Sequence, residues 1–357
     1  MDTFLTITWG AAKGIDLGFF TLRFYSLLFA LGFILGFRVM KKIFISEKTP
    51  LDDLDKLLTY MVIATVVGAR LGHVFFYQWD YYSQNLLEIF MVWEGGLASH
   101  GAAVAIIFSL YLYSKKVSKK SVLWILDRVV ITVALAAVFI RLGNFANSEI
   151  YGNMANSSIE TVFLRPTQEA LEGYLDGGLL SVDFEATGEK WETDSMVYPQ
   201  YKITLVTTEP GITDKVASRL QAPVKSILTN KDSDHRNFIF PDNSPLPQKV
   251  GPTTLVTYGY GVPRFPTQLI EAGAYLLIFL WLYLAFWKTS IKAQMGSLFG
   301  QFLVLLFGFR FFVEYLKANQ VNFEAGMSFN MGQWLSIPLV LIGLFFIVYP
   351  YFKNQKS

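Results

Sequence analysis

The 357-residue chain contains no cysteine and only three histidines, and its 30 basic residues nearly balance its 28 acidic ones. The missing thiols exclude a disulfide framework, a thiolate metal site and a cysteine nucleophile. A formal net charge of +2 provides no field for nucleic acid, so we expect no nucleic-acid partner. The N-terminus also lacks the charged region and cleavage site of a removable signal, so we expect the first apolar segment to be retained.

Apolar residues dominate the composition. Hydrophobic residues make up 53% of the chain and charged residues only 16%, and the apolar residues gather in long blocks. Such blocks are typical of membrane-spanning helices, so the sequence predicts an all-α polytopic membrane protein. We expect about seven spans, at Ile15–Met40, Leu57–Tyr77, Leu97–Tyr113, Val122–Phe145, Leu269–Trp287, Leu298–Leu316 and Trp334–Phe352.

Basic residues are distributed unevenly between the loops. They gather in the first, third and fifth loops and at the C-terminus, whereas residues 78–96 contain no Lys or Arg. Basic loops favour the cytoplasmic side of a membrane. We therefore expect the N-terminus outside and the C-terminus in the cytoplasm, in a bacterial cytoplasmic (inner) membrane.

A segment with the composition of a soluble protein, Asn153 to Thr254, separates spans four and five. By the orientation above it is extracytoplasmic. Tyr201, Ile203 and Leu205 alternate with more polar residues, which predicts a strand. We interpret this segment as a partly β head domain. The first four membrane helices then lie in residues 1–152 and the last three in residues 255–357.

Costly polar residues recur near the outer ends of six predicted spans. An Arg in a membrane helix costs roughly 2.5 kcal/mol or more, so it needs a partner or a function. Guanidinium groups with carboxylates at one level suit an anionic phosphate, which indicates chemistry on a lipid headgroup. The residues are Arg23, Tyr25, Arg70, His73, His100, Arg141, Asn144, Glu271, Arg310 and Glu314.

Other interpretations of single residues stay open. Arg310 and Glu314 are spaced i,i+4, which also fits a simple helix-supporting pair. His100 fits equally well as a helix-start residue bonded to the backbone. Asp127 and Arg128, near the inner end of span four, are expected to be snorkelling or topological residues.

Six motifs together resemble the bacterial phosphatidylglycerol prolipoprotein diacylglyceryl transferases. Their order and the predicted topology also agree with that family. The motifs are Gly68–Tyr77, Trp93–Gly101, Arg141–Glu149, Pro263–Glu271, Phe309–Glu314 and Met331–Pro338.

The resemblance implies an activity. Members move the diacylglyceryl group of phosphatidylglycerol to the thiol of the lipobox cysteine of a preprolipoprotein, within membrane lipid, and release glycerol phosphate. No metal or redox cofactor is expected. The motifs imply catalytic roles for Arg141, Arg310, His100, Glu149 and Glu314. They imply substrate binding by Tyr25, Arg70, Asn144, Gly152, Arg264 and Glu271.

Physical chemistry suggests roles for some of these residues. The leaving phosphate gathers negative charge, so Arg141 and Arg310 are predicted phosphate clamps, with Glu149 and Glu314 orienting them. A free thiol has a pKa near 8.5, so a base would speed attack, and His100 is the candidate.

The chain departs from the family pattern at several positions. Ala146-Asn147-Ser148 replaces the usual Ile-Asn-Gly, and Phe265, Ile270 and Leu306 replace His or Tyr. Two alternatives therefore stay open: a transporter of anionic solutes, and a lipid-binding relative without catalysis. Transporters usually have related halves and polar residues at the midplane, a pattern that the sequence does not show.

Overall fold

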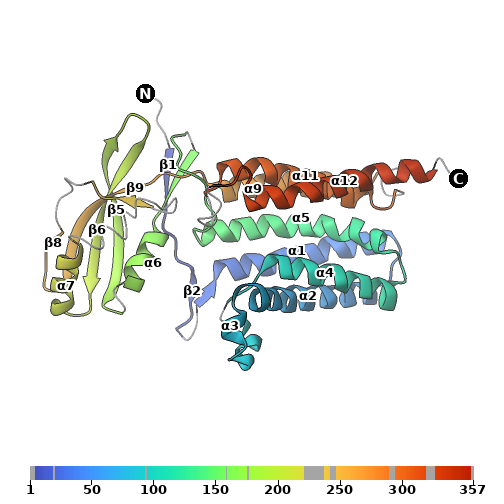
Figure 1. Ribbon diagram of the computed structural model, residues 1–357, viewed down its shortest axis with the longest axis horizontal. Helices are drawn as coiled ribbons and strands as arrows, with labels where there is room; N and C mark the ends of the chain where they lie inside the picture. Colours follow the sequence, from blue (N-terminus) through green and yellow to red (C-terminus); the bar gives the residue numbers. More distant parts are fainter. Residues whose placement is uncertain are drawn as a thin grey trace. The chain divides into compact units, whose positions relative to one another are not determined.

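The computed structural model describes residues 5–18, 21–92, 95–157, 159–174, 177–220, 237–241, 247–288, 294–318 and 326–354 (Figure 1). The chain forms two compact units, each described by itself. The first unit comprises Met1–Phe29, Phe139–Ala274 and Phe309–Ile337. The second comprises Ala30–Val138, Tyr275–Gly308 and Pro338–Ser357.

Five helices among the described residues are long and apolar enough to cross a membrane. They are α2 (Leu51–Tyr77), α5 (Val122–Ala146), α9 (Thr267–Phe286), α11 (Ser297–Val313) continued by the 3₁₀ turn η4 (Glu314–Leu316), and α12 (Met331–Asn354). The helices α1 (Phe24–Ser46) and α4 (Ser99–Tyr113) fall outside this set. The long apolar helices agree with a polytopic membrane protein.

The first helix begins later than predicted. Two short antiparallel strands, β2 (Gly14–Asp16) and β3 (Thr21–Arg23), precede α1, and Arg23 pairs with Gly14. The backbone turns at Gly18, which has φ +84 and donates its N–H to Asp16 Oδ1 at 2.8 Å. The predicted start of a helix at Ile15 is therefore wrong, and Arg23 is an exposed strand residue.

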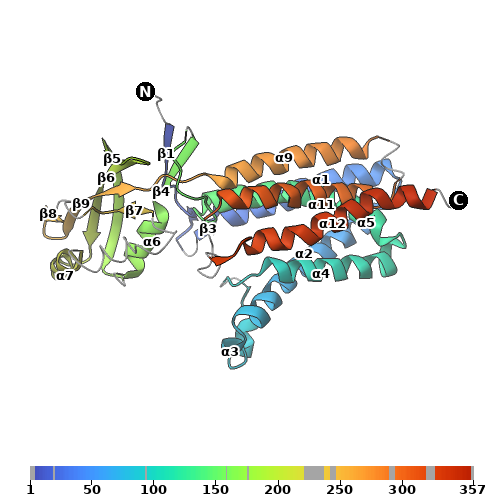
Figure 2. The same ribbon diagram turned by 45° about the horizontal axis from the view of Figure 1, so that its top comes forward.

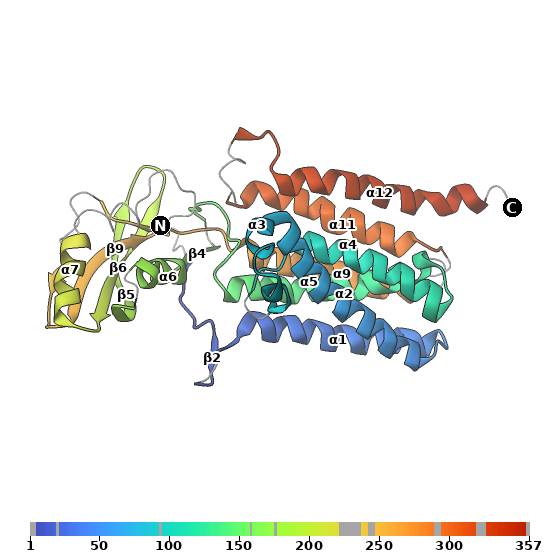
Figure 3. The same ribbon diagram turned by 60° about the horizontal axis from the view of Figure 1, so that its bottom comes forward.

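Helices α2 and α4 of the second unit lie side by side (Figure 3). A Cβ added to Gly72 would lie 2.7 Å from Cα of Gly101, so only glycine permits this approach. In the chain between α2 and α4 lie the short helix α3 (Trp79–Tyr82), which projects from the end of α2 (Figure 2), and the turn η1 (Leu86–Phe90).

A buried polar cluster in the second unit corrects another prediction. Arg128 donates to both oxygens of Glu47, at 2.9 and 2.6 Å, and both side chains are buried. Asp127 accepts backbone N–H groups of Gly296 and Phe299 at 2.7 and 2.9 Å, where α11 begins. Neither Asp127 nor Arg128 snorkels, because each is committed to a partner within the protein.

The first unit contains an antiparallel sheet in the order β5-β6-β9-β7, with β8 also paired to β9. Its strands are β5 (Leu179–Glu192), β6 (Val197–Thr207), β7 (Phe238–Ile239), β8 (Gln248–Lys249) and β9 (Thr254–Gly261). Tyr201, Ile203 and Leu205 of β6 are buried, which confirms the predicted strand. Helices α6 (Arg165–Tyr174) and α7 (Pro210–Leu220) pack on this core through Leu171 and Val216.

The N-terminal segment joins this region through pairing that the sequence did not suggest. Strand β1 (Leu5–Trp9) runs parallel to β4 (Ile159–Phe163). Thr8 Oγ1 and Tyr201 Oη share a 2.6 Å hydrogen bond, while burial raises the pKa of the Tyr201 hydroxyl. Strand β1 is thereby held both to β4 and, through Thr8, to β6 of the sheet.

Candidate active site

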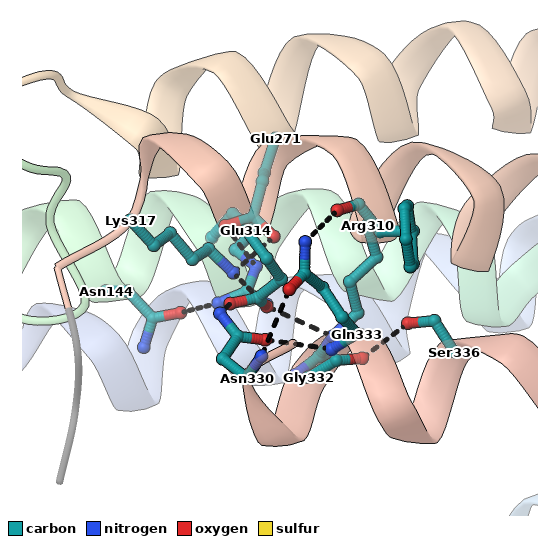
Figure 4. A network of polar contacts seen from close by, with 11 residues as sticks. Asn144, Glu271, Arg310, Glu314, Lys317, Asn330, Gly332, Gln333 and Ser336 are labelled. Carbon is teal, nitrogen blue, oxygen red and sulfur yellow. Dashed lines mark hydrogen bonds and ion pairs between the residues drawn. The ribbon is translucent and has the colours of Figure 1, made fainter. Parts of the chain in front are cut away.

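Five charged side chains of the first unit form a continuous ionic chain (Figure 4). Arg141 Nε lies 3.2 Å from Glu271 Oε2, and Lys317 Nζ lies 3.1 Å from Glu271 Oε1. The same ammonium lies 3.1 Å from Glu314 Oε1, which also lies 3.4 Å from Arg310 Nε. The structure thus brings together charges that the sequence distributes over α5, α9, α11, η4 and the residue after η4.

The ionic chain contains one more cation than carboxylates. Three cations alternate with Glu271 and Glu314, and their exposures differ. The side chain of Lys317 is 2% exposed and that of Arg141 11%, whereas Arg310 is 34% exposed. The guanidinium of Arg310 is therefore the most accessible of these cations, and an accessible guanidinium is suited to bind an anionic group.

Glu314 is positioned by the start of α12. Asn330 donates its amide to Glu314 Oε2 at 3.2 Å, and exchanges hydrogen bonds of 2.9 and 3.0 Å with Gln333. A Cβ on Gly332 would lie 2.6 Å from the carboxylate carbon of Glu314. Gly332 therefore leaves the space that this carboxylate occupies.

Sequence reasoning missed the central member of the chain, Lys317. Its ammonium is buried between two carboxylates. The available signal was a lysine three residues after Glu314, which is within reach across one helical turn. Asn330 was missed as well, because no periodicity marks a residue that acts through its amide.

The segment after α5 extends the site from Arg141. Arg141 Nη1 donates to Asn144 Oδ1 at 3.2 Å, and Asn144 Nδ2 donates to Glu149 Oε1 at 2.8 Å. The helix ends at Ala146, and Ser148 takes a left-handed conformation with φ 55. This turn brings Glu149 back toward Asn144, so Glu149 is joined to Arg141 through the amide.

Tyr25 lies against the same segment. Its ring contacts Gly143, where an added Cβ would lie 2.7 Å from the ring atom Cδ2. Tyr25 is also within electrostatic range of Arg141 and Glu149. The first helix therefore contributes its predicted tyrosine to the neighbourhood of the ionic chain.

Gly152 and Arg264 make close contacts with the backbone. Gly152 donates its N–H to Phe265 at 2.9 Å, and an added Cβ would lie 2.7 Å from the carbonyl oxygen of Leu316. Arg264 is buried, donates to the Gly152 carbonyl at 3.1 Å and lies over the Tyr151 ring. These contacts favour positioning roles for both residues.

Arg70 and His100, also predicted as site residues, belong to the second unit. Arg70 is buried, lies over the Tyr82 ring and donates to the carbonyls of Glu88, Ile89 and Gly95. Its guanidinium therefore holds the segment between α3 and α4.

His100 is exposed and shares the lining of a pocket of about 450 Å³ with His73. Both imidazole rings contact the Tyr77 ring. Among the described residues no group of three or more His, Asp or Glu side chains is suited to a metal ion, and metal-free catalysis stays a prediction.

The apolar helices and the buried ionic chain define an integral membrane protein with a cationic site on its helices. The family model described as prolipoprotein diacylglyceryl transferase matches residues 13–349, and the chain belongs to this family. The predicted resemblance is thus confirmed.

Similar proteins named phosphatidylglycerol–prolipoprotein diacylglyceryl transferase come from three bacteria. The protein of Tolumonas auensis is 33% identical over 92% of both chains. That of Chloroherpeton thalassium is 33% identical over 97% of this chain and 95% of its own length. That of Porphyromonas gingivalis is 33% identical over 91% of this chain and 87% of its own length.

Proposed function

We propose that this chain transfers the diacylglyceryl group of phosphatidylglycerol to the thiol of a lipobox cysteine in a preprolipoprotein. Glycerol phosphate is the other product, and the reaction is the first step of lipoprotein maturation. The names of the relatives supply the two substrates. The observation that carries the proposal is the ionic chain, because it holds two arginines of which Arg310 is accessible, and guanidinium groups suit a phosphate.

In this reaction the thiolate sulfur attacks the glyceryl carbon that carries the phosphate. A carbon–sulfur bond forms while the carbon–oxygen bond to phosphate breaks, and the thiol proton passes to a base. Negative charge gathers on the leaving phosphate. Prepositioned guanidinium donors stabilise such charge by about 3 kcal/mol each, so Arg141 and Arg310 are the proposed clamps.

The neighbouring residues take supporting roles. Glu271 orients the guanidinium of Arg141 and Glu314 orients that of Arg310. The ammonium of Lys317 holds the two carboxylates close together. His100 stays the predicted base, as the family motif implies. Arg70, Gly152 and Arg264 would position backbone segments, whereas Tyr25 and Asn144 would contact the substrate or its clamp.

We also propose seven spans, obtained by adding α1 and α4 to the five long apolar helices. The N-terminus and residues 153–254 would then be extracytoplasmic and the C-terminus cytoplasmic, in the inner membrane. Because the chain has no cysteine, single-cysteine variants report topology cleanly. A cysteine at Glu189 should react with an impermeant maleimide in intact spheroplasts, and one at Lys119 should not; the reverse pattern would refute the orientation.

The activity is tested by glycerol phosphate release from the purified protein in phosphatidylglycerol-containing micelles. Release should require a lipobox peptide and vanish when its cysteine is replaced by serine. Arg141→Ala should abolish release, whereas Arg23→Ala, which alters an exposed strand residue, should not. A folded protein that binds the lipid without thiol-dependent release would instead be a non-catalytic lipid-binding relative.

A further inference from the structure

The sheet of the first unit has a long outer edge along β5. In the order β5-β6-β9-β7, the strand β6 is paired on both sides, whereas β5 pairs only with β6 among the described residues. Residues 181–186 of β5 run in unbroken register with β6 and include neither Pro nor Gly. At every second residue of an outer strand the backbone N–H and C=O point away from the sheet, so this edge can pair with a further extended chain.

The exposed face of β5 limits which chains can pair with it. Asp183 and Glu185 are exposed and, two residues apart on a strand, share one face. Glu185 lies 3.3 Å from Lys202 of β6. Two copies of β5 would bring carboxylates next to carboxylates, and like charges on facing strands are destabilising. A chain with basic or uncharged residues meets no such repulsion, so a different polypeptide fits this edge better than a second copy.

The other face of β5 favours apolar side chains. Val182 is buried in the core of the sheet, and the half-buried Phe184 packs against that core with its ring 5.4 Å from the ring of Phe238. An added strand would place alternate side chains beside Val182 and Phe184 and cover them. The edge therefore suits an extended chain in which apolar residues alternate with basic or uncharged polar residues.

A short stretch of backbone joins this sheet to the ionic chain. Gly152 forms an antiparallel bridge with Lys317, the central cation of the ionic chain. Four residues further on, the amide of Asn156 donates to the carbonyl of Ser195 at 3.1 Å, in the turn between β5 and β6. Four extended residues span at most about 13 Å. The turn of the β5–β6 hairpin is thus near the ionic chain, within the same unit.

The proposed protein substrate brings an extended chain to this place. Its lipobox cysteine reacts beside the ionic chain, and the residues after the cysteine continue from that point as a polypeptide. From Glu192, at the hairpin turn, back to Ala186 the strand adds about 20 Å at about 3.3 Å per residue. About ten extended residues therefore reach from the ionic chain to the regular part of the edge, and about six more cover it.

We propose that residues 181–186 of β5 bind the preprolipoprotein as an additional β-strand, through the part of its chain about ten to sixteen residues after the lipobox cysteine. The assignment rests on the proposed function, because that function supplies the polypeptide. Backbone hydrogen bonds provide the affinity, and the two faces of β5 provide the preference for sequence. The strand pairing gives the sheet a role in the choice of protein substrate.

Disulfide trapping tests the pairing directly, because the chain has no cysteine of its own. Asp183→Cys protein is oxidised with peptides whose lipobox cysteine is serine and whose single cysteine is moved along the following residues. Trapping should be strongest about ten to sixteen residues after the lipobox position and should alternate with a period of two. Glu172→Cys, exposed on α6, is the control and should trap less than about one-tenth as much. Equal trapping by the two variants, or trapping without alternation, would exclude a bound strand.

Transfer kinetics test the consequence for substrate choice. A peptide that continues with alternating Val and Lys for about sixteen residues after the cysteine should have a kcat/KM at least fivefold above that of one ending after about four. N-methylation of the backbone amides in the extension should remove the gain, because it removes the donors. Replacing Lys by Glu should remove it too, and the double variant Asp183→Lys, Glu185→Lys should reverse the preference between the Lys and Glu peptides.

The short peptide separates this proposal from the proposed function. Transfer to the short peptide with no gain from the extension would overturn the strand pairing and retain the function. Trapping by Asp183→Cys without transfer to any peptide would do the opposite. Disulfide-linked dimers of Asp183→Cys in place of peptide adducts would show that a second copy covers β5, which also overturns the proposal.

Discussion

Two buried ionic groups lie on the apolar helices, one in each compact unit, and they are built differently. In the Arg128 cluster (Glu47, Asp127 and Arg128), the guanidinium meets a carboxylate through two hydrogen bonds. The second carboxylate accepts two N–H groups at the start of α11. In the ionic chain (Arg141, Glu271, Lys317, Glu314 and Arg310), the oppositely charged groups lie 3.1 to 3.4 Å apart and Arg310 is partly exposed.

We interpret the Arg128 cluster as structural and the ionic chain as functional. In the Arg128 cluster the guanidinium and the Glu47 carboxylate are both buried, so no cation is accessible. In the ionic chain the side chain of Arg310 is 34% exposed, which leaves a guanidinium accessible to an anion. Burial of charge is costly in both, but only the second arrangement leaves binding energy for a ligand. Substitutions should therefore affect activity in one region and stability in the other.

Arg310→Ala should have the largest effect on activity. Removing one charge-stabilising donor typically lowers kcat by about 10²–10³-fold. Because the side chain is 34% exposed, the free energy of unfolding should change by less than about 1 kcal/mol. Arg310→Lys should recover part of the rate, since it retains the charge without the fork. Near-normal transfer by Arg310→Ala would contradict the functional assignment of the ionic chain.

Arg128→Leu should show the opposite behaviour. It leaves the Glu47 carboxylate buried without its guanidinium, which should lower the free energy of unfolding by about 3–5 kcal/mol. The protein that remains folded should transfer lipid normally. Replacing Glu47 by leucine as well should restore much of the stability, as measured by unfolding in mixed micelles. A rate defect in the folded fraction would show that the cluster also serves catalysis.

Gly332→Ala should have a smaller effect, confined to the site. The new methyl group would displace the Glu314 carboxylate, and we expect about a tenfold loss of kcat from misorientation of Arg310. Gly308→Ala, on the same helix as Arg310 but with no atom within 4 Å of an added Cβ, is the matched control. Equal rates for the two variants would show that Glu314 tolerates displacement.

The sequence predicted the elements that depend on local patterns. Long apolar blocks identified the helices, and alternation around Ile203 identified a strand. It failed at Ile15, where the apolar run continues through a turn and a strand pair before the helix begins. It also failed for β1, whose partner β4 lies about 150 residues away, because parallel pairing over such a distance leaves no local pattern.

In the candidate site, too, the sequence predicted what a local pattern marks and missed what depends on distant segments. Arg141, Glu271, Arg310 and Glu314 were predicted because charges inside apolar blocks are conspicuous. Lys317 was not, because it lies just past a span, where lysine is common.

By itself the sequence determined the apolar helices, the strand-forming insertion, the family and the arginines within the apolar helices. These depend on residue type and spacing, which are properties of the chain alone. Only the tertiary structure decided which carboxylate holds each cation, that Lys317 joins two of them, and that the Arg128 cluster is buried while Arg310 of the ionic chain is accessible. Pairing and exposure depend on how distant segments pack. The type of a charged residue does not reveal whether its partner is a protein group or a ligand.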